Sequence, residues 1–384
     1  MPEEEGGDAL GAVVTAEKHR LLGGFRRESA RDRCWLRGCS NRPSGDMQLH
    51  LHVGHGKTGS SFLQSWWALN RAELWQVARL LYPVGGADRR ARAGAFSMGN
   101  GLLLDRALQA SDRPRQLRRL WADLLRQVPR FATEAPNGLV FSAERWARVL
   151  PQQLEGLLRV ADAGGVEQIR IWLLVRDPLD HALSVYGQMV KRHGFTGSLD
   201  DWLEIYDFPQ VLLSCLNAFQ SRPDRMVLRL DHYGQQRRQL LERMQAWLQL
   251  PSEGPWQAPV QGRVNRSLST HELLLMRWLN SRYSDRAAPV GEALVDRLPN
   301  LAPARLQPSA EAVQRFLQRW SPVVDQINAL LPAPAQLQLV APEAGGVEER
   351  LDSALSDPAI SLLPEQLDCL VEGLQRLMAP GASR

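Results

Sequence analysis

Short apolar runs recur along the middle of the chain, separated by segments of helical length. The runs are MQLHLHV from residue 47, RLLYPV from residue 79, GLVFS from residue 138, QIRIWLLV from residue 168 and RMVLRL from residue 225. Apolar runs of this length are typical of strands buried on both faces, and their alternation with helices is typical of a parallel sheet. The pattern therefore predicts an α/β fold in which helices cover both faces of a parallel sheet.

The last third of the chain predicts helices rather than strands. Ser269 and Glu272 have the spacing of a capping box at the start of one helix. A second helix is predicted around LDCLVEGLQRLM, whose apolar residues repeat on one face at positions 367, 370, 371, 374, 377 and 378. The stretch LPSEGPWQAPVQG, from residue 250, predicts a long loop.

Residues 1–46 mix acidic, glycine-rich and arginine-rich pieces without sustained periodicity, so we expect a poorly ordered extension there. A single domain is predicted over residues 47–384, with a core at 48–235 and a helical region at 265–384. Met47 stands immediately before the first predicted strand. We expect the domain to begin at this residue. A further hypothesis is that the natural start codon also lies at Met47, which a mass measurement on native protein would test.

Composition and charge narrow the class of protein only a little. The chain has 384 residues, 44% of them hydrophobic, and no apolar run of membrane-spanning length. It opens with MPEEEGG, unlike a secretory signal peptide, so we expect a cytoplasmic protein. The four cysteines are too scattered for a disulfide framework, and Cys34 and Cys39 have no second pair to complete a zinc site. The formal charge of +4 suits a polyanionic small ligand as well as nucleic acid.

The stretch HLHVGHGKTGSSFLQ, residues 50–64, passes from a strand through a glycine-rich turn into a predicted helix. Such a turn exposes unpaired backbone N–H groups at the positive end of the helix dipole, where anions bind. Three glycines allow close approach of a ligand, and one lysine and three hydroxyls supply donors: Gly54, Gly56, Gly59, Lys57, Thr58, Ser60 and Ser61. The sequence predicts a phosphate-binding cradle, with an ordinary glycine-rich turn as the alternative.

This cradle does not follow the pattern of the nucleotide-triphosphate P-loop, which has glycine, four residues, glycine, lysine and then serine or threonine. Counted from Gly54, the second glycine falls at Gly59 as required, but Ser60 occupies the lysine position. Lys57 comes two residues before that glycine instead. The register therefore argues against a standard ATP or GTP site.

A second candidate for phosphate binding is IRIWLLVRDPLDHALSVYGQMVKRHG, residues 169–194, a buried strand followed at once by a helix. Asp177 can cap that helix and Pro178 suits its first turn. Arg176 then lies at the carboxyl edge of the sheet, where ligands bind in open α/β folds. Ser184, two turns into the helix, could present its hydroxyl on the same side. The alternative is an Arg176–Asp177 ion pair with Ser184 as a packing residue.

Together these two segments resemble the sulfotransferases that use 3′-phosphoadenosine 5′-phosphosulfate (PAPS). That family carries a loop of the form K-[TS]-G-[TS]-[TS] after its first strand, matched here from Lys57 to Ser61. It also carries R-[DN]-P with a serine eight residues after the arginine, matched by Arg176 and Ser184. HVGHGKTGSSFLQ is most similar to a bacterial branch with the loop H-[IV]-G-x-x-K-T-G-T-[ST]-x-L-Q. The resemblance covers residues 48–235, with a weaker echo in GRVNRSLS, where Arg263 and Asn265 are minor candidates.

The resemblance implies a P-loop-like fold and a role for each matched residue. The N–H groups from Gly56 to Ser61, with the hydroxyls of Thr58, Ser60 and Ser61, would hold the 5′-phosphosulfate. Arg176 and Ser184 would hold the 3′-phosphate. Lys57 would neutralise charge that develops on the bridging oxygen as the sulfuryl group leaves. The reaction implied needs no metal and releases 3′,5′-adenosine bisphosphate.

Sulfuryl transfer to a hydroxyl or amine benefits from a base beside the acceptor. Our first candidate is Glu144 in SAERW, directly after the strand GLVFS. Related bacterial sequences are similar here, with S-x-E, and carbohydrate sulfotransferases commonly use a glutamate base. Alternatively Glu144 caps the following helix or pairs with Arg145 or Arg148.

The second candidates are histidines, whose pKa suits proton transfer near neutral pH. His55 lies inside the cradle, where shaping the turn is the alternative role, and His52, which alternates with His50 on the first strand, is expected to be packed or hydrogen-bonded. His193, with Lys191 and Arg192, is expected at a helix end, where cations are favourable for structural reasons or could touch an anionic acceptor. Trp66 and Trp67, after the cradle, are expected in the core.

We therefore expect a PAPS-dependent sulfotransferase that acts on a carbohydrate or glycoconjugate, the acceptor class resting on the resemblance alone. A nucleotide-dependent phosphotransferase that needs magnesium and ATP is the main alternative, and a non-catalytic nucleotide-binding protein is another. No nucleic-acid partner is expected; a protein that binds one through its basic surface would show steep salt dependence.

Overall fold

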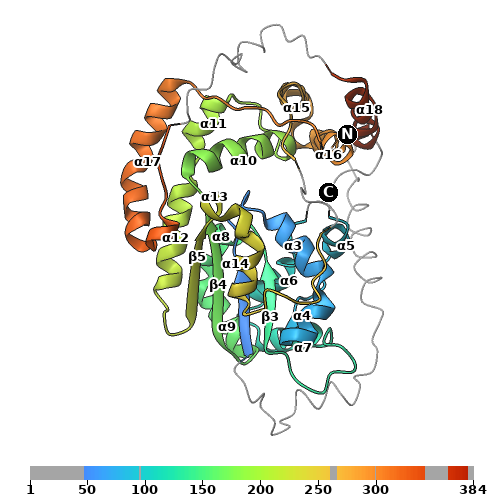
Figure 1. Ribbon diagram of the computed structural model, residues 1–384, viewed down its shortest axis with the longest axis vertical. Helices are drawn as coiled ribbons and strands as arrows, with labels where there is room; N and C mark the ends of the chain where they lie inside the picture. Colours follow the sequence, from blue (N-terminus) through green and yellow to red (C-terminus); the bar gives the residue numbers. More distant parts are fainter. Residues whose placement is uncertain (1–46, 95–96, 260–265, 299, 342–361, 379–384) are drawn as a thin grey trace, which may run out of the picture. The chain divides into compact units, whose positions relative to one another are not determined.

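The computed structural model describes residues 47–94, 97–259, 266–298, 300–341 and 362–378, all within one compact unit, Gly45–Arg384 (Figure 1). The predicted extension at 1–46 and the minor candidates Arg263 and Asn265 lie outside the described residues. The strands are β1 (Met47–His52), β2 (Leu80–Leu81), β3 (Gly138–Ser142), β4 (Val166–Val175) and β5 (Met226–His232).

The helices that surround the sheet are α3 (Ser60–Leu69), α4 (Arg71–Ala78), α5 (Asp88–Arg92), α6 (Leu102–Gln109), α7 (Pro114–Leu125), α8 (Trp146–Val149), α9 (Leu154–Ala163), α10 (Pro178–Arg192), α11 (Leu199–Ile205), α12 (Phe208–Gln220), α13 (Tyr233–Gln236) and α14 (Leu240–Trp247). The C-terminal helices are α15 (Thr270–Tyr283), α16 (Ala288–Arg297), α17 (Ala310–Leu330) and α18 (Pro364–Met378). Four short 3₁₀ turns join some of them: η1 (Leu150–Gln153), η2 (Arg237–Gln239), η3 (Ser284–Ala287) and η4 (Ala333–Ala335).

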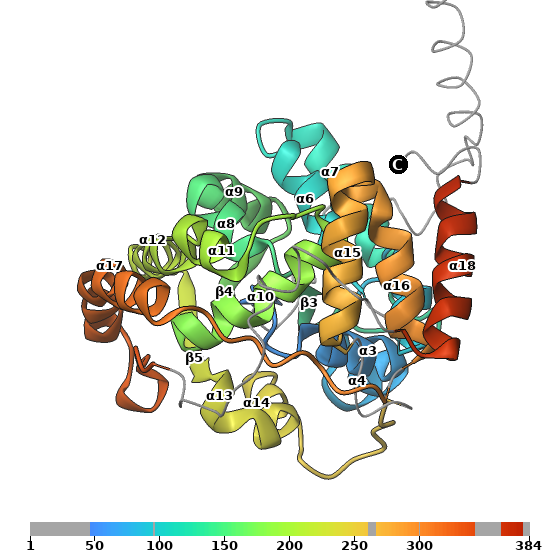
Figure 2. The same ribbon diagram turned by 90° about the horizontal axis from the view of Figure 1, so that it is seen from above.

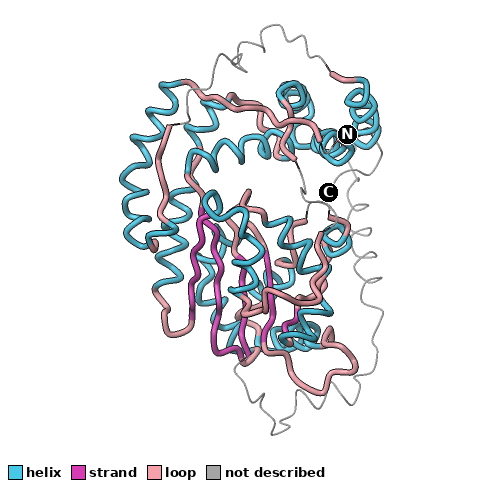
Figure 3. Tube along the Cα trace, viewed as in Figure 1, coloured by secondary structure: helices cyan, strands magenta, loops and turns pink. Residues whose placement is uncertain are grey.

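The five strands form one sheet in the order β2-β3-β1-β4-β5, and every neighbouring pair is parallel (Figure 3). This confirms the predicted fold class, a parallel sheet with helices on both faces. The chain fills one side of β1 with β2 and β3 and then crosses to the other side for β4 and β5. In open α/β sheets, ligands bind at the carboxyl edge beside such a crossing. The residues that follow β1, β3 and β4 therefore lie at the edge where a ligand is expected to bind.

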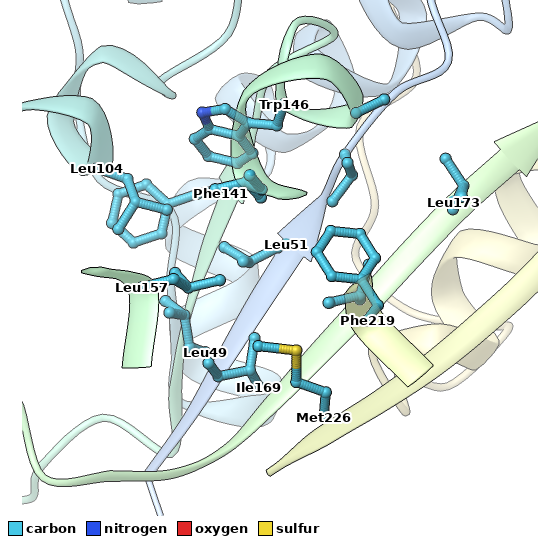
Figure 4. Close-up of a cluster of buried hydrophobic side chains, with 14 of the residues drawn as sticks. Leu49, Leu51, Leu104, Phe141, Trp146, Leu157, Ile169, Leu173, Phe219 and Met226 are labelled. Atoms are coloured by element: carbon cyan, nitrogen blue, oxygen red, sulfur yellow. The ribbon is translucent and has the colours of Figure 1, made fainter. Parts of the chain in front are cut away.

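Side chains of β1 alternate between two separate cores, because successive residues of a strand point to opposite faces. Leu49 and Leu51 are fully buried in the larger core with Phe141 and Ile169 (Figure 4). Helices α6, α7, α9 and α12 cover this face (Figure 2). Burial of each of these leucine side chains stabilises the fold by roughly 1.5–3 kcal/mol.

The opposite face of the sheet is covered by α3, α4 and α14 and is rich in tryptophan. Trp66 and Trp67 are fully buried there, as the sequence predicts, together with Trp172 and Trp247. This packing fixes α3 against the sheet, and with it the turn that precedes α3.

A helical layer lies beyond the carboxyl edge of the sheet (Figure 1). It has its own core, built from α10, α11, α15, α16 and α17. The predicted capping box is confirmed: the Ser269 N–H donates to Glu272 Oε2 at 2.8 Å, and the Glu272 N–H donates to the Ser269 hydroxyl at 3.4 Å. The buried Glu272 carboxylate also receives two hydrogen bonds from Arg266, at 2.7 and 2.8 Å.

Helix α18 buries the apolar stripe of its sequence only in part, with Leu370 and Leu374 packed against the core of the helical layer. Leu367 and Val371 remain 48% and 55% exposed, and the face turned to α16 carries Gln366, Cys369 and Gly373. The reason is close approach: a Cβ on Gly373 would lie 2.5 Å from Cα of Val290, so this contact selects small residues. Among the residues that the structure describes, no helix is long and apolar enough to cross a membrane.

Candidate active site

Three segments singled out by the sequence meet at the carboxyl edge of the sheet. In the parallel register, His52 at the end of β1 pairs with Ser142 of β3 on one side and with Trp172 of β4 on the other. The turn at residues 53–59 follows β1, Glu144 follows β3 and Arg176 follows β4. Because the strands are adjacent and parallel, the structure brings these three segments together.

The turn at residues 53–59, which we call the cradle, depends on residues in the left-handed region of φ. Gly54, Lys57 and Gly59 have φ values of 88°, 62° and 82°. A Cβ on Gly54 would lie 2.8 Å from both Cα and O of Glu144, so the backbones of the cradle and of Glu144 are in contact. Glycine at position 54 is therefore required both by conformation and by space.

The cradle presents unpaired backbone donors at the start of α3. Among the described residues, the N–H groups of Gly56, Lys57, Thr58 and Gly59 have no hydrogen-bond acceptor. Gly59 is the N-cap of α3 and provides no side-chain cap, so the first N–H groups of the helix are left open as well. Donors that converge at the positive end of a helix dipole form an anion-binding site.

Two carbonyl groups of the cradle, in contrast, are held by side chains: His181 of α10 and Arg176, two residues before that helix. His181 Nε2 lies 3.0 Å from the backbone oxygen of Gly56. Arg176 Nη1 donates to the backbone oxygen of Lys57 at 2.9 Å. Two consecutive peptide groups are thus fixed by side chains more than 100 positions further along the chain.

The three hydroxyl side chains of the cradle differ in their surroundings. Thr58 is fully buried, and its hydroxyl donates to the backbone oxygen of His55 at 2.6 Å, so it braces the turn. The hydroxyl of Ser60 is buried beside the carboxylate of Glu144, whose pKa it lowers. Ser61 is half-buried. Unlike the hydroxyl of Thr58, the hydroxyl of Ser60 is therefore not bonded to the backbone of the turn.

Lys57 and Glu144, both half-buried, influence each other's protonation. A Cβ built on Gly56 would lie 3.5 Å from Glu144 Oε2, which places the carboxylate against the cradle. Burial raises the pKa of Glu144, while Lys57, Ser60 and Arg192 act in the opposite direction. Burial also lowers the pKa of Lys57, with Glu144 opposing the shift. The site thus pairs a carboxylate that accepts protons more readily than usual with a lysine that gives them up more readily.

The structure removes two alternative roles for Glu144. Arg145 forms its ion pair with Asp105, and Arg148 forms a bidentate pair with Asp207 at 2.7 and 2.8 Å. Helix α8 has no side-chain cap. The carboxylate of Glu144 is consequently left for the cradle side.

Arg176 lies directly after β4, at the edge where the sequence places it. Its guanidinium makes a bidentate pair with Asp180, one turn further on, with the Nη2 contact at 2.8 Å. The same group lies 5.7 Å from the centre of the Tyr233 ring. Its side chain is 16% exposed. Ser184 is half-buried on α10, with no hydrogen bond to any described residue.

Asp177 occupies the predicted N-cap position of α10, but its carboxylate does not cap the helix. It accepts from the backbone N–H of Gln338 at 2.7 Å and from His232 Nε2 at 3.1 Å. The pKa of Asp177 is lowered because these hydrogen bonds outweigh its burial. Nothing in the local sequence indicates these partners, since both are distant along the chain.

The histidine candidates lie in the interior and lose most of their basicity there. Burial lowers the pKa of His50, His52 and His55 to about 3 in each case. His52 Nδ1 is 2.9 Å from the Ser142 hydroxyl, and the His50 ring packs edge-on against Trp247. Groups with such a low pKa are poor bases at neutral pH. Glu144 therefore remains the better candidate for a base.

Sequence reasoning missed the contribution of His181, which is buried against the His55 ring at a centroid distance of 3.9 Å. For the cations at the end of α10, the sequence predicts their place at a helix end but not their effect on Glu144. Lys191 is 3% exposed, and burial lowers its pKa well below the usual value. Nε of Arg192 lies 3.8 Å from Oε1 of Glu292, and the charge of Arg192 lowers the pKa of Glu144. His193 is the C-cap of α10, which agrees with its predicted place at the helix end.

No protein-family model matches the sequence, and a search of curated proteins gives no match. Among solved structures, the chain is similar to a sulfotransferase from Alicyclobacillus acidocaldarius, with 13% identity, 75% of this chain and 95% of that chain covered, and a TM-score of 0.37. It is also similar to the sulfotransferase domain from the curacin biosynthetic pathway, with 16% identity, 73% and 98% coverage, and a TM-score of 0.33.

Proposed function

We propose that the protein is a sulfotransferase that uses PAPS as its sulfuryl donor. The observation that carries the proposal is the cradle, whose consecutive N–H groups at the start of α3 have no acceptor among the described residues. A lysine belongs to the same turn and a glutamate lies against it. This combination of anion donors, a cation and a base suits transfer of an anionic group.

The residues present fit the two ends of the donor. The cradle N–H groups and the buried Ser60 hydroxyl would hold the 5′-phosphosulfate, with Ser61 at the same end. Arg176 and Ser184 would hold the 3′-phosphate. Because Arg176 is paired with Asp180 in this structure, binding would exchange that carboxylate for phosphate oxygens. A planar guanidinium suits either partner, since both offer two oxygens.

PAPS, when bound, supplies a sulfuryl group on a good leaving group. Glu144 would accept the proton of the acceptor hydroxyl as that oxygen takes the sulfuryl group, and the bisphosphate would be the leaving group. Lys57 compensates the negative charge that appears on the leaving oxygen. A base contributes roughly 10²- to 10⁴-fold in such a reaction. The raised pKa of Glu144 favours this role because a carboxylate whose pKa lies closer to neutral pH is a stronger base.

For the acceptor we propose a hydroxyl of a carbohydrate or glycoconjugate. The support is the resemblance of HVGHGKTGSSFLQ to the bacterial branch often linked with polysaccharides, and a glutamate rather than a histidine beside the cradle. This assignment of acceptor class is by analogy.

The test is transfer of ³⁵S from labelled PAPS to a panel of mono- and polysaccharides, with EDTA present throughout. Label should appear in acceptor with wild-type protein and be lost in Lys57→Ala. Transfer of phosphate from ATP that depends on magnesium, with no sulfur transfer, would contradict the proposal and favour a phosphotransferase.

A further inference from the structure

His181 connects the cradle to the helical layer through two hydrogen bonds. Its Nε2 lies 3.0 Å from the backbone oxygen of Gly56, and its Nδ1 lies 2.5 Å from the hydroxyl oxygen of Tyr206. His181 and Tyr206 are both buried, 1% and 3% exposed. The His181 ring also packs against His55 and Phe208, at centroid distances of 3.9 and 4.8 Å. The ring therefore has one defined position.

The partners also fix the tautomer of His181. A carbonyl oxygen only accepts, so Nε2 must carry the hydrogen that bonds Gly56. In the neutral ring Nδ1 is then an acceptor, and the Tyr206 hydroxyl donates to it. Tyr206 suits this role because it stays protonated in its buried position, where its pKa is raised. The chain Tyr206, His181, Gly56 is thus directional, with every hydrogen assigned.

We infer that His181 is a positioning residue that aims the cradle's N–H groups at the ligand. The peptide groups on either side of Lys57 are trans, so each C=O points opposite to the N–H of the same peptide. His181 holds the Gly56 carbonyl on its own side, which turns the Lys57 N–H away from His181. Arg176 holds the Lys57 carbonyl and turns the Thr58 N–H in the same manner.

Without these two anchors a glycine-rich turn could rotate its peptides and offer carbonyl oxygens to an anion, which would repel it. Lys57 itself sits at a φ of 62°, a conformation that a non-glycine residue adopts at a cost, so the turn needs external support. The inference rests on the proposed function only for the identity of the ligand. The orientation of the donors is a property of the turn and applies to any small oxyanion.

Four variants separate positioning from simple packing. His181→Phe keeps a ring against His55 but has no donor for Gly56, whereas His181→Gln keeps an N–H at similar reach. Tyr206→Phe removes only the hydroxyl that orients His181. Tyr186→Phe is the matched control, because it removes a buried hydroxyl of α10 that donates to Gly197 at 3.2 Å, away from the cradle.

Calorimetry with 3′,5′-adenosine bisphosphate gives the first readout. We expect His181→Phe to weaken binding about tenfold, Tyr206→Phe about threefold, and His181→Gln to restore it to within about threefold of wild type. Tyr186→Phe should bind like wild type. Wild-type affinity in a folded His181→Phe variant would overturn the inference, as would equal losses in His181→Gln and His181→Phe. If His181→Phe does not fold, Tyr206→Phe against Tyr186→Phe decides in the same way.

A second readout does not depend on the proposed donor. Sodium sulfate is titrated into ¹⁵N-labelled protein, and the amide signals of Lys57 and Thr58 are followed. We expect sulfate to shift both amides in wild type and in His181→Gln, and to leave them nearly unchanged in His181→Phe. Equal shifts in wild type and His181→Phe would overturn the inference. A third outcome separates the two proposals. If the wild-type protein does not bind the bisphosphate but its amide signals still shift with sulfate only when His181 is present, the proposed donor is rejected and the positioning role is supported.

Discussion

Arg176 donates from Nη1 to the backbone oxygen of Lys57 across 2.9 Å, so the arginine after β4 holds the lysine turn after β1. The same guanidinium pairs with Asp180 of α10. The two segments that carry the resemblance to sulfotransferases are therefore in direct contact. Arg176 shapes the cradle and, in the proposed function, also meets the 3′-phosphate.

Replacing either cation at this contact should weaken ligand binding severely. We expect Lys57→Ala and Arg176→Ala each to lower affinity for 3′,5′-adenosine bisphosphate by about 10- to 100-fold, the range for charge-assisted hydrogen bonds. Arg115→Ala is the control, since Arg115 is an exposed arginine of α7. Calorimetry measures all three, and wild-type affinity in either cradle variant would reject its place in the site.

Glu144→Gln should separate binding from turnover. The amide keeps the shape of the carboxylate but is no base, so turnover should fall by about 10²- to 10⁴-fold with bisphosphate affinity nearly unchanged. In wild type, activity should fall as the pH drops through the pKa of Glu144, which lies above the ordinary value of 4.5. Steady-state rates across pH check this. Full turnover in the variant would transfer the base role to another group.

The buried histidines should make the fold sensitive to mild acid. His50, His52 and His55 have pKa values near 3 when folded, against 6.5 in the unfolded chain. The unfolded state therefore binds more protons below pH 6.5, and stability falls as the pH decreases from 6.5 toward 3. Between pH 7.5 and 5.5 these three rings should contribute a loss of about 4 kcal/mol to the free energy of unfolding, and His181, whose pKa burial also lowers, should add to it.

Urea unfolding at several pH values measures this loss. The window from pH 7.5 to 5.5 lies above the range in which unperturbed carboxylates titrate, and a variant that lacks one ring isolates the contribution of that histidine. A His50→Gln variant should show a shallower slope, smaller by the contribution of one group. Stability that is independent of pH across this window would show that the rings are protonated or solvated in the folded protein.

Gly54 should tolerate no side chain. Its φ of 88° is strained for alanine, and a Cβ would lie 2.8 Å from the backbone of Glu144. We expect Gly54→Ala to lower the free energy of unfolding by about 2 kcal/mol or more. Gly86→Ala, where a Cβ meets nothing within 4 Å, should change it by less than about 0.5 kcal/mol. Thermal unfolding compares the two, and equal melting temperatures would contradict the close contact.

The strands and the cradle were predictable because their signals are local. Apolar runs mark β1, β3, β4 and β5 in the sequence, and glycine spacing with one lysine marks the turn. Glu144 and Arg176 followed from one further rule, that residues after adjacent parallel strands share an edge.

Contacts that join distant segments were not predictable in this way. His181 meets Gly56 across 125 positions because α10 passes the cradle, and a lone histidine in a helix carries no sign of that. Asp177 looks like a helix cap, but His232 and Gln338 engage its carboxylate. Helix α18 buries Gly373, and Leu370 and Leu374 only in part, because α16 approaches too closely at Gly373 for a larger residue.

The most direct test of the proposed donor is calorimetric titration of 3′,5′-adenosine bisphosphate, ADP and ATP into the wild-type protein without metal. We predict binding of the bisphosphate in the micromolar range and at least about tenfold tighter than ADP, because ADP lacks the 3′-phosphate that Arg176 would hold in the proposed site. ATP that binds as tightly or more tightly once magnesium is added, or a bisphosphate that does not bind, would contradict the account.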